Sequence, residues 1–192
     1  MRKNQRSFCG LFMAGFMMIF LLAYPCVVVY AGELPDSHPS CVTCRGSLSP
    51  LGRWCDNNNG TVTDMTTGLV WLKDAGWGGQ YPLWIDKADG VDAISRVAQV
   101  KDGNPATLSD GSLEGDWTMP TLKQLNIIAT GTEAISYFDR YFFTHVLGAY
   151  WSVTTYTDTP NSYAWWVSLV DGGHGYTSAT NSKSVWPVRD GR

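Results

Sequence analysis

The stretch that decides the fold reads Arg53-Trp-Cys-Asp-Asn-Asn-Asn-Gly-Thr-Val-Thr-Asp64 and continues as Met65-Thr-Thr-Gly-Leu-Val-Trp-Leu72. Asn59-Gly60 predicts a two-residue hairpin turn, because both positions of such a turn need a positive φ that Asn and Gly tolerate. Thr67-Gly68 predicts a second turn into Leu69 to Leu72, an apolar run typical of a strand buried on both faces. The stretch therefore predicts a short antiparallel meander.

The middle of the chain predicts two helices separated by a loop. Apolar residues recur at helical spacing from Trp84 to Ala98, so we expect an amphipathic helix over this range. A second helix is expected after Pro120, because Thr121 and Gln124 can form a capping box. Lys101 to Asp116 is rich in Gly, Asp, Ser and Pro, which favours a long loop.

The last third predicts β structure after a packed aromatic turn at Phe138 to Phe143. We expect strands at Ala149 to Thr155, Tyr163 to Val170 and Ser184 to Arg189, with a long loop from Asp171 to Lys183. Pro187 should confine the last strand to a sheet edge or a bulge. The whole pattern predicts an α+β fold, a single loop-rich domain with short antiparallel strands and two small helices.

The N-terminus has the form of an export signal. Arg2, Lys3 and Arg6 precede an uncharged apolar run from Phe8 to Tyr24. We expect residues 1–31 to be a signal peptide, 32–50 a leader or linker containing Pro, Ser and Cys, and 51–192 the domain. The alternative is an uncleaved membrane anchor, since the run nearly reaches the roughly 20 residues of a spanning helix. We expect an exported protein of the periplasm, the cell surface or the medium.

Charge excludes some partners. After residue 31 the chain keeps 11 of its 14 Lys and Arg residues, because three lie in the signal, against 17 Asp and Glu. An acidic chain without a basic run does not fit nucleic acid or a polyanion bound mainly by charge. Extracellular partners of other kinds, glycan or protein, are therefore expected.

Three cysteines follow the predicted cleavage site, namely Cys41, Cys44 and Cys55. We expect one disulfide between Cys44 and Cys55, with Cys41 to Cys55 as the alternative pairing. A redox role for Cys41-Val-Thr-Cys44 and a zinc site made with His38 are competing interpretations, but neither has the sequence context that its chemistry usually shows. We therefore expect no metal and no cofactor.

Trp-centred phrases recur along the chain at a spacing that resembles a known family. They are Gly68-Leu-Val-Trp71, Gly115-Asp-Trp-Thr-Met-Pro120, Tyr150-Trp-Ser-Val-Thr-Thr155, Tyr163-Ala-Trp-Trp-Val167 and Val185-Trp-Pro-Val-Arg189, together with Asn59-Gly-Thr-Val-Thr-Asp64. In order and spacing they resemble the Lcl C-terminal domain family, named for the C-terminal domain of a collagen-like bacterial adhesin. The resemblance implies a distant relation to the C-type lectin-like and sulfatase-modifying-factor folds, and an extracellular attachment role.

The chain departs from the family pattern in one phrase. Trp117-Thr-Met-Pro120 stands where the family commonly has Trp-Arg-Leu-Pro, so a cation is missing. In the namesake adhesin this domain is implicated in trimer formation and in attachment to sulfated polysaccharides. The lost cation and the acidic balance favour a neutral glycan or a protein instead.

No catalytic motif accompanies the histidines of the domain, His145 and His174. A Gly-x-Ser-x-Gly elbow and a His-Glu-x-x-His helix are both absent from the sequence, and no cysteine follows Cys55, whereas sulfatase-modifying enzymes of the related fold use a pair of cysteines in the body of the domain. We therefore expect a non-enzymatic protein, with an enzyme of the sulfatase-modifying-factor-like fold as the least favoured reading.

The aromatic content favours binding. All nine tryptophans follow the signal, and flat aromatic faces stack on sugar rings. Trp71, Trp117 and Trp151 are expected in the core. Trp165 and Trp166 must face opposite sides of a strand, and we expect the Trp166 side to carry the ligand surface. The candidate ligand-binding residues are Trp166, Tyr156, His174, Tyr176 and Arg189. The alternative function is a structural or assembly module without a small ligand, for which the expected partner is a further copy of the chain in a homo-oligomer.

Overall fold

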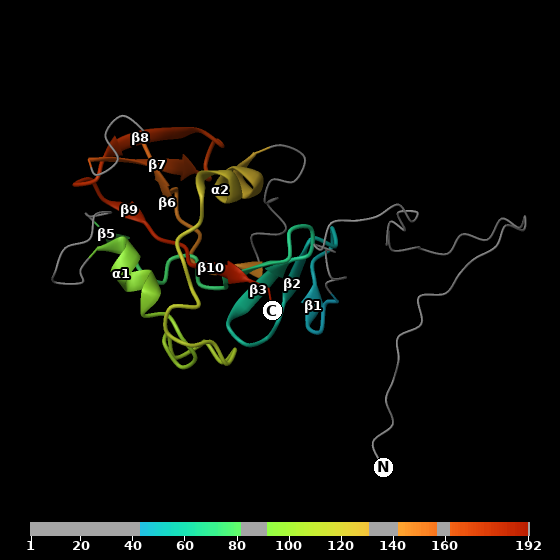
Figure 1. Cartoon of the computed structure of the whole chain (residues 1–192). Coiled ribbons are helices and arrows are strands. Elements are labelled where there is room, and N and C mark those ends of the chain that lie inside the picture. The colour runs from blue at the N-terminus through green and yellow to red at the C-terminus, as the bar shows by residue number, and fades with distance from the viewer. Residues whose placement is uncertain (1–42, 82–91, 131–141, 157–161, 192) are drawn as a thin grey trace, which may run out of the picture. The chain divides into compact units, whose positions relative to one another are not determined.

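The computed structural model describes residues 43–81, 92–130, 142–156 and 162–191, all within a compact unit that spans Pro39–Arg192. In these ranges the chain forms two five-stranded sheets and two short helices (Figure 1). The prediction of an α+β fold with short strands and two small helices is confirmed. The predicted signal peptide and most of the predicted leader lie outside the described residues.

The first sheet is the meander predicted from Arg53 to Leu72, extended at both edges. Its strands are β1 (Ser47–Leu48), β2 (Trp54–Asp56), β3 (Thr61–Asp64), β4 (Leu69–Leu72) and β10 (Val188–Asp190), in the order β1-β2-β3-β4-β10. Every neighbouring pair is antiparallel. Residues 47–48 of the predicted leader thus belong to the sheet, and Pro187 leads into an edge strand as its chemistry requires.

The turn between β2 and β3 differs from the predicted two-residue turn. Cys55 pairs with Thr63 and Asp56 with Val62, so the loop is longer. Positive φ angles occur at Asn58 and Gly60, not at Asn59. The Asn59 side chain accepts hydrogen bonds from the backbone and hydroxyl of Thr61 instead. These bonds stabilise a wider turn than the Asn-Gly pair alone indicates.

The second sheet is built mainly from the C-terminal third of the chain. Its strands are β5 (Gln80–Tyr81), β9 (Lys183–Ser184), β6 (Ala149–Thr155), β7 (Tyr163–Ser168) and β8 (His174–Ser178), in the order β5-β9-β6-β7-β8. β6 and β9 run parallel, whereas the other neighbours are antiparallel. The predicted strand from Ala149 to Thr155 is confirmed, and the one begun at Tyr163 ends at Ser168. The prediction of a loop throughout Asp171 to Lys183 is wrong, because β8 lies in it.

The predicted strand from Ser184 to Arg189 is also wrong, because the chain divides it between the two sheets. β9 ends at Ser184 and β10 begins at Val188. Between them Trp186 is fully buried and its indole N–H donates to the Leu72 carbonyl at 2.8 Å. Its ring contacts those of Trp71 on β4, Tyr150 on β6 and Phe143. Trp186 therefore joins the two sheets in one core.

The helices are short. α1 (Ala93–Ala98) begins after Asp92, whose extended backbone and side-chain hydrogen bond to the Ser95 backbone mark it as the N-cap. A continuous helix from Trp84 to Ala98 is therefore wrong, and residues 82–91 lie outside the described ranges. α2 (Leu122–Ala129) begins at the predicted capping box, with Thr121 bonded to the Gln124 backbone and Gln124 bonded back.

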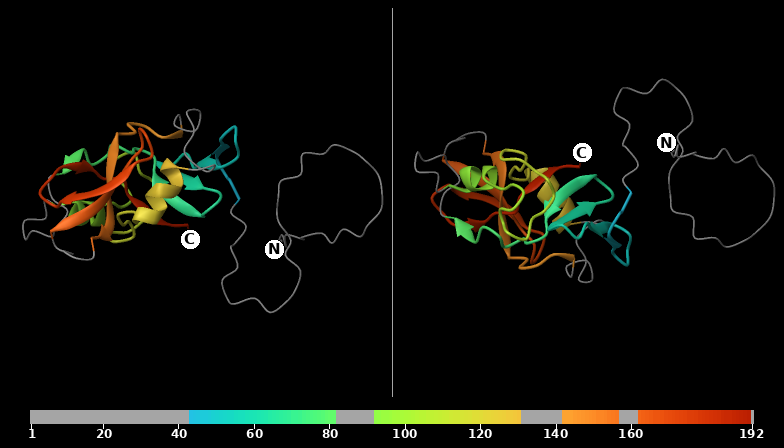
Figure 2. Two further views of the ribbon diagram at one scale, coloured as in Figure 1. Left: turned by 90° about the horizontal axis from the view of Figure 1, so that it is seen from above. Right: turned by 90° about the horizontal axis from the view of Figure 1, so that it is seen from below.

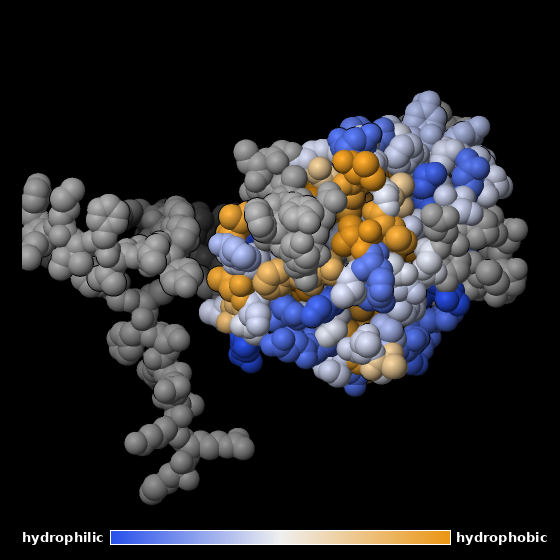
Figure 3. Space-filling view, turned by 180° about the vertical axis from the view of Figure 1, so that it is seen from behind, coloured by the Kyte–Doolittle hydropathy of each residue, from blue (hydrophilic) through white to orange (hydrophobic). Residues whose placement is uncertain are grey.

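The core confirms the expected tryptophans. Trp71, Trp117 and Trp151 are all fully buried, and so is Trp54. Of the predicted aromatic turn, residues 138–141 lie outside the described ranges, while Phe143 is buried between Trp54 and Trp186. Two further views show how the two sheets and α2 are arranged (Figure 2). Apolar residues also reach the surface on the face turned away in Figure 1 (Figure 3).

A buried ion pair supports the first sheet. Arg53 donates through Nε and Nη2 to the two carboxylate oxygens of Asp64, at 3.2 and 2.8 Å. The guanidinium also lies over the Trp54 ring. Burial alone would raise the pKa of Asp64, but hydrogen bonds from Arg53 and Thr66 outweigh it and hold the pKa below its usual value.

Candidate ligand-binding surface

Aromatic side chains gather where β7 pairs with β8. Trp165 lies directly opposite Tyr176 in the antiparallel register, and Tyr163 lies opposite Ser178. Side chains of directly opposed residues share one face of a sheet. Tyr156 follows β6 and reaches the same group, because its backbone N–H donates to the Tyr163 carbonyl.

The rings of this group contact one another closely. Tyr156 and Tyr176 stack with ring centroids 4.1 Å apart and an interplanar angle of 20°. Trp165 meets Tyr176 edge to face at 5.3 Å and lies 5.9 Å from the ring of His174. Tyr163 closes the group against Tyr176 at 6.1 Å. We call Tyr156, Tyr163, Trp165, His174 and Tyr176 the aromatic platform.

The platform is open to solvent. Tyr176 is 49% exposed and Tyr163 39%, and His174 is exposed, while Trp165 and Tyr156 are half-buried. Stacked aromatic rings that are this exposed contribute little to a core. Near the platform, the turn before β8 carries the exposed carboxylate of Asp171. Hydrogen bonds from Ser168 and the Gly173 backbone lower the pKa of Asp171, so this carboxylate remains charged at neutral pH.

The structure places Trp166 apart from the platform. Trp166 lies opposite Trp151 and Gly175, on the other face of β7 from Trp165. Its ring packs against Gly175, where an added Cβ would lie only 3.2 Å away, and the Lys183 amine lies 5.2 Å above the ring. Half-buried and packed against the core, Trp166 has the surroundings of a structural residue. The aromatic face predicted on the Trp166 side lies on the Trp165 side.

Arg189 also lies elsewhere, in the edge strand of the first sheet. Its Nε and Nη2 donate to Asp110 Oδ2 at 3.1 and 2.9 Å, and its guanidinium lies over the buried Trp117 ring. Burial of the Asp110 side chain alone would raise its pKa, yet hydrogen bonds from Ser112 and Arg189 outweigh this and lower the pKa. Arg189 therefore fastens the loop between α1 and α2 to β10.

A shallow polar depression of about 230 Å³ lies beside Arg189. Its lining residues come from β4, β10, α2 and the loop before α2; they are Leu69, Gly115, Asp116, Thr118, Gln124, Val188, Arg189 and Asp190. Gln124 is held in the capping box, and Asp116 accepts from the Leu113 backbone. The polar groups of this depression are thus largely committed to the fold.

The remaining reactive side chains of the described residues are few. His145 Nδ1 lies 2.9 Å from Asp74 Oδ1, and the ring is mostly exposed. The described ranges contain no cluster of three or more His, Cys, Asp or Glu residues suited to a metal. They also contain no helix with the length and apolar character needed to cross a membrane.

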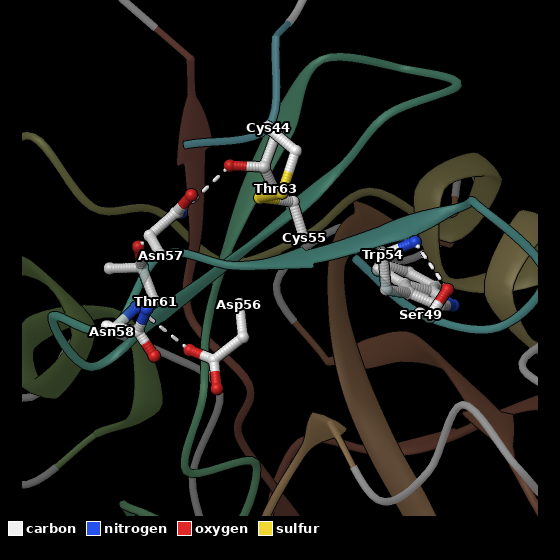
Figure 4. Close-up of a disulfide and its surroundings, with 9 residues drawn as sticks. All are labelled: Cys44, Ser49, Trp54, Cys55, Asp56, Asn57, Asn58, Thr61 and Thr63. Atoms are coloured by element: carbon white, nitrogen blue, oxygen red, sulfur yellow. Dashed lines mark hydrogen bonds between the residues drawn. A yellow bond between two sulfur atoms is a disulfide. The ribbon is translucent and has the colours of Figure 1, made fainter. Parts of the chain in front are cut away.

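The disulfide joins Cys44 and Cys55, as predicted (Figure 4). Cys55 lies at the middle of β2, so the bond fastens the segment before β1 to the first sheet. Around it, Asn57 donates to the hydroxyls of Thr61 and Thr63, and Ser49 accepts from the Trp54 backbone. The bond uses Cys44, which the redox interpretation requires, and both Cys44 and Cys55, which the zinc interpretation requires, so it contradicts both.

Sequence reasoning missed Trp165 and Tyr163 as members of the platform. The alternation Tyr163-x-Trp165 already placed them on one face, but the sequence does not reveal which face meets the core. The alternation His174-x-Tyr176-x-Ser178 was the signal for β8, and neighbouring glycines favoured a loop instead. The structure brings three of the five candidates together, Tyr156, His174 and Tyr176, and separates Trp166 and Arg189 from them.

These observations define a disulfide-linked α+β domain whose aromatic residues are divided between a two-sheet core and an exposed platform. The model of the Lcl C-terminal domain matches residues 60–189, and the chain belongs to this family. No curated protein matches the chain. The matched range contains both helices and the whole platform, whereas β1, β2 and the disulfide precede it.

Proposed function

We propose that this protein is an exported, non-catalytic recognition domain, C-type lectin-like in fold, which binds a neutral glycan through the aromatic platform. The observation that carries the proposal is the set of contacting rings at Tyr156, Trp165 and Tyr176, of which Tyr176 is exposed and the other two are half-buried. Pyranose rings present flat C–H faces that stack on such surfaces. The phenol hydroxyls and the imidazole beside them supply directional hydrogen bonds.

Charge supports a neutral ligand. Strand β8, which carries His174 and Tyr176, contains no Lys, Arg, Asp or Glu, and its preceding turn contributes the carboxylate of Asp171. A sulfated or phosphorylated polymer would meet this negative charge and the acidic balance of the chain without a cationic cluster to hold it. Hydroxyl-rich, uncharged sugars avoid that repulsion.

Export has two supports that are independent of each other. The Cys44–Cys55 bond is of the kind that persists in oxidising compartments. The N-terminal sequence has a basic start and a long apolar run, as signal peptides do. An extracellular or periplasmic location is where a domain that recognises glycans meets them.

The test is a screen of the protein from residue 32 onward on a glycan array, followed by calorimetry with the best neutral oligosaccharide. Trp165→Ala should weaken binding by roughly 1 to 3 kcal/mol, a typical cost for an aromatic at the centre of an interface. Leu113→Ala is the matched control, because Leu113 is an exposed apolar residue outside the platform; it should leave affinity unchanged.

Two results would contradict the proposal. One is an array on which no neutral glycan binds, and the other is a folded Trp165→Ala variant with unchanged affinity. Preferential binding of sulfated glycans would refute the charge argument in particular. A protein that binds no glycan but associates with itself would favour an assembly module.

A further inference from the structure

Two tyrosines form the closest ring contact of the aromatic platform. Tyr156 and Tyr176 stack with their ring centroids 4.1 Å apart and an interplanar angle of 20°. The other ring contacts within the platform have centroid separations between 5.3 and 6.1 Å. Tyr156 follows β6 and Tyr176 lies in β8, and β7 lies between these two strands in the sheet (Figure 1). The stacked pair therefore connects parts of the chain that are not neighbours in the sheet.

Both rings are accessible to small molecules from the solvent. Tyr176 is 49% exposed and Tyr156 is half-buried, whereas Tyr150 of β6 is fully buried against Trp186. Tyr163 is 39% exposed and also contacts Tyr176, but edge to face and with a centroid separation of 6.1 Å. Tyr156 and Tyr176 thus combine solvent access with the shortest distance between two phenol rings of the platform.

Phenol side chains that lie this close together can be joined by oxidation. Removal of one electron and the hydroxyl proton from a tyrosine leaves a phenoxyl radical, whose unpaired electron is shared with the two Cε carbons beside the hydroxyl-bearing carbon. Two such radicals couple through a new bond between a Cε of each ring. The hydrogen on each joined carbon then leaves as a proton, while each oxygen is protonated again. The product, dityrosine, has lost two electrons and two protons in total.

We propose that Tyr156 and Tyr176 are an oxidative modification site, at which the two side chains are joined as dityrosine. The co-reactant is hydrogen peroxide, activated by a haem peroxidase. The peroxide takes up the two electrons and two protons and becomes two molecules of water. The bond forms within one chain, because the second phenol ring lies next to the first in the same molecule.

The observed stack needs little rearrangement to reach the joined state. A single bond between two phenol rings holds their centroids at nearly the separation that Tyr156 and Tyr176 already have. Coupling therefore requires the two rings to turn from face-to-face contact to a shared edge, without bringing the strands closer together. Exposed side chains rotate on a timescale of picoseconds to nanoseconds. Tyr163, by contrast, would have to move toward Tyr176 as well as turn.

The cross-link has a consequence for the stability of the second sheet. It joins the residue after β6 to the middle of β8 across β7, and so closes a covalent loop between Tyr156 and Tyr176. A covalent loop stabilises the folded state because it restricts the unfolded chain. The coupling chemistry does not depend on glycan binding, so its failure would leave the proposed function intact.

Treatment of the purified protein with a haem peroxidase and limiting hydrogen peroxide tests the proposal. The wild type should develop dityrosine fluorescence, and the yield per molecule should not fall when the protein is diluted. Digestion on the N-terminal side of aspartates places Tyr156, Tyr163 and Tyr176 on three different peptides, because Asp158 and Asp171 lie between them. Mass spectrometry should find the Tyr156 peptide linked to the Tyr176 peptide, with the summed mass of both less two hydrogens.

Two conservative variants with an unchanged circular dichroism spectrum separate proximity from exposure. Tyr156→Phe keeps the stacked ring but lacks the phenol hydroxyl, and should lose most of the dityrosine. Tyr163→Phe is the matched control, because Tyr163 is the more exposed of the two, and should keep the wild-type yield. Oxidation should raise the melting temperature of the wild type and not that of Tyr156→Phe.

Three results would overturn the proposal. They are a folded wild type that forms no dityrosine, a cross-link that joins Tyr163 or two copies of the chain, and a folded Tyr156→Phe variant with the wild-type yield. A cross-linked wild type that melts no higher than the untreated protein would refute the stabilising role of the bond.

Discussion

The first sheet and the β7–β8 end of the second sheet both carry aromatic side chains, but with different neighbours. On the first sheet, Trp54 and Trp71 are wholly buried and are joined through Trp186 to the second sheet. At the β7–β8 end, the exposed rings of Tyr163 and Tyr176 contact each other and the half-buried rings of Tyr156 and Trp165. Aromatic content alone therefore does not distinguish a buried core from an exposed platform, whereas the neighbours of each ring do.

The largest expected loss of stability comes from removing a ring of the buried aromatic core. Trp186→Ala removes a fully buried ring that contacts Trp71, Phe143 and Tyr150 and donates to the Leu72 carbonyl. We expect a loss of about 3–5 kcal/mol in the free energy of unfolding, measured by urea denaturation. Tyr176→Ala is the comparison and should cost less than about 1 kcal/mol, because that ring is half exposed. Equal losses of stability in the two variants would contradict the distinction between core and platform aromatics.

The next largest loss of stability is expected from breaking the buried ion pair between Arg53 and Asp64, which lies beside Trp54. Asp64→Asn leaves the Arg53 guanidinium buried beside Trp54 without its counter-charge, and should cost about 3 kcal/mol. The pKa of Asp64 is held below 3.8 in the folded protein, so its stabilisation is present above pH 3.8 and is lost as pH falls through the folded value.

Urea denaturation at several pH values measures both the stability cost of Asp64→Asn and the acid dependence of stability. The wild type should lose stability steeply below pH 3.8, and Asp64→Asn should show a shallower loss. The slope should not vanish, because Asp110 has a lowered pKa as well. An identical acid dependence in both proteins would show that the Arg53–Asp64 pair does not control it.

A smaller effect compares neighbours in one strand. Trp166 packs over Gly175 and against the core, so Trp166→Ala should cost about 2 kcal/mol of stability, less than a fully buried tryptophan. Trp165→Ala should cost about 1 kcal/mol, since its contacts are with the platform. Thermal melts of both variants measure the difference, and the reverse order would place the core on the Trp165 side.

The smallest expected effect concerns the N-cap of α2, which belongs to neither aromatic group and therefore serves as a reference for both. Thr121→Ala removes the cap hydroxyl that accepts from the Gln124 backbone at 3.2 Å. The expected cost is about 1 kcal/mol, with no change in glycan affinity. Thr121→Ser keeps a cap hydroxyl and should retain most of the stability that Thr121→Ala loses. A change in affinity would mean that α2 communicates with the platform.

The sequence predicted those features of the fold that depend on residues close together in the chain. The capping box at Thr121 and the meander around Gly60 and Gly68 depend on residues a few positions apart, and both appear in the structure. The Cys44–Cys55 bond also closes a short span. Helix α1 shows the limit, because Asp92 caps it partway along a periodic pattern that predicted a longer helix.

Features that depend on distant contacts could not be predicted in the same way. Alternation placed Trp165 and Trp166 on opposite faces, but only the packing of Trp151, Gly175 and Lys183 around Trp166 determines which face is covered. The role of Arg189 depends on Asp110, which lies 79 residues earlier in the chain. No pattern within either segment indicates this pairing.

The place of β10 has a consequence for how the protein folds. Strands β1 to β4 follow one another closely, so their ladders can form as soon as residue 72 is available. The outer side of β4, however, pairs with Val188–Asp190, more than 100 residues later. Contacts of such separation form slowly. During synthesis in the N-to-C direction, the outer side of β4 therefore has no β10 partner until Val188–Asp190 has been made.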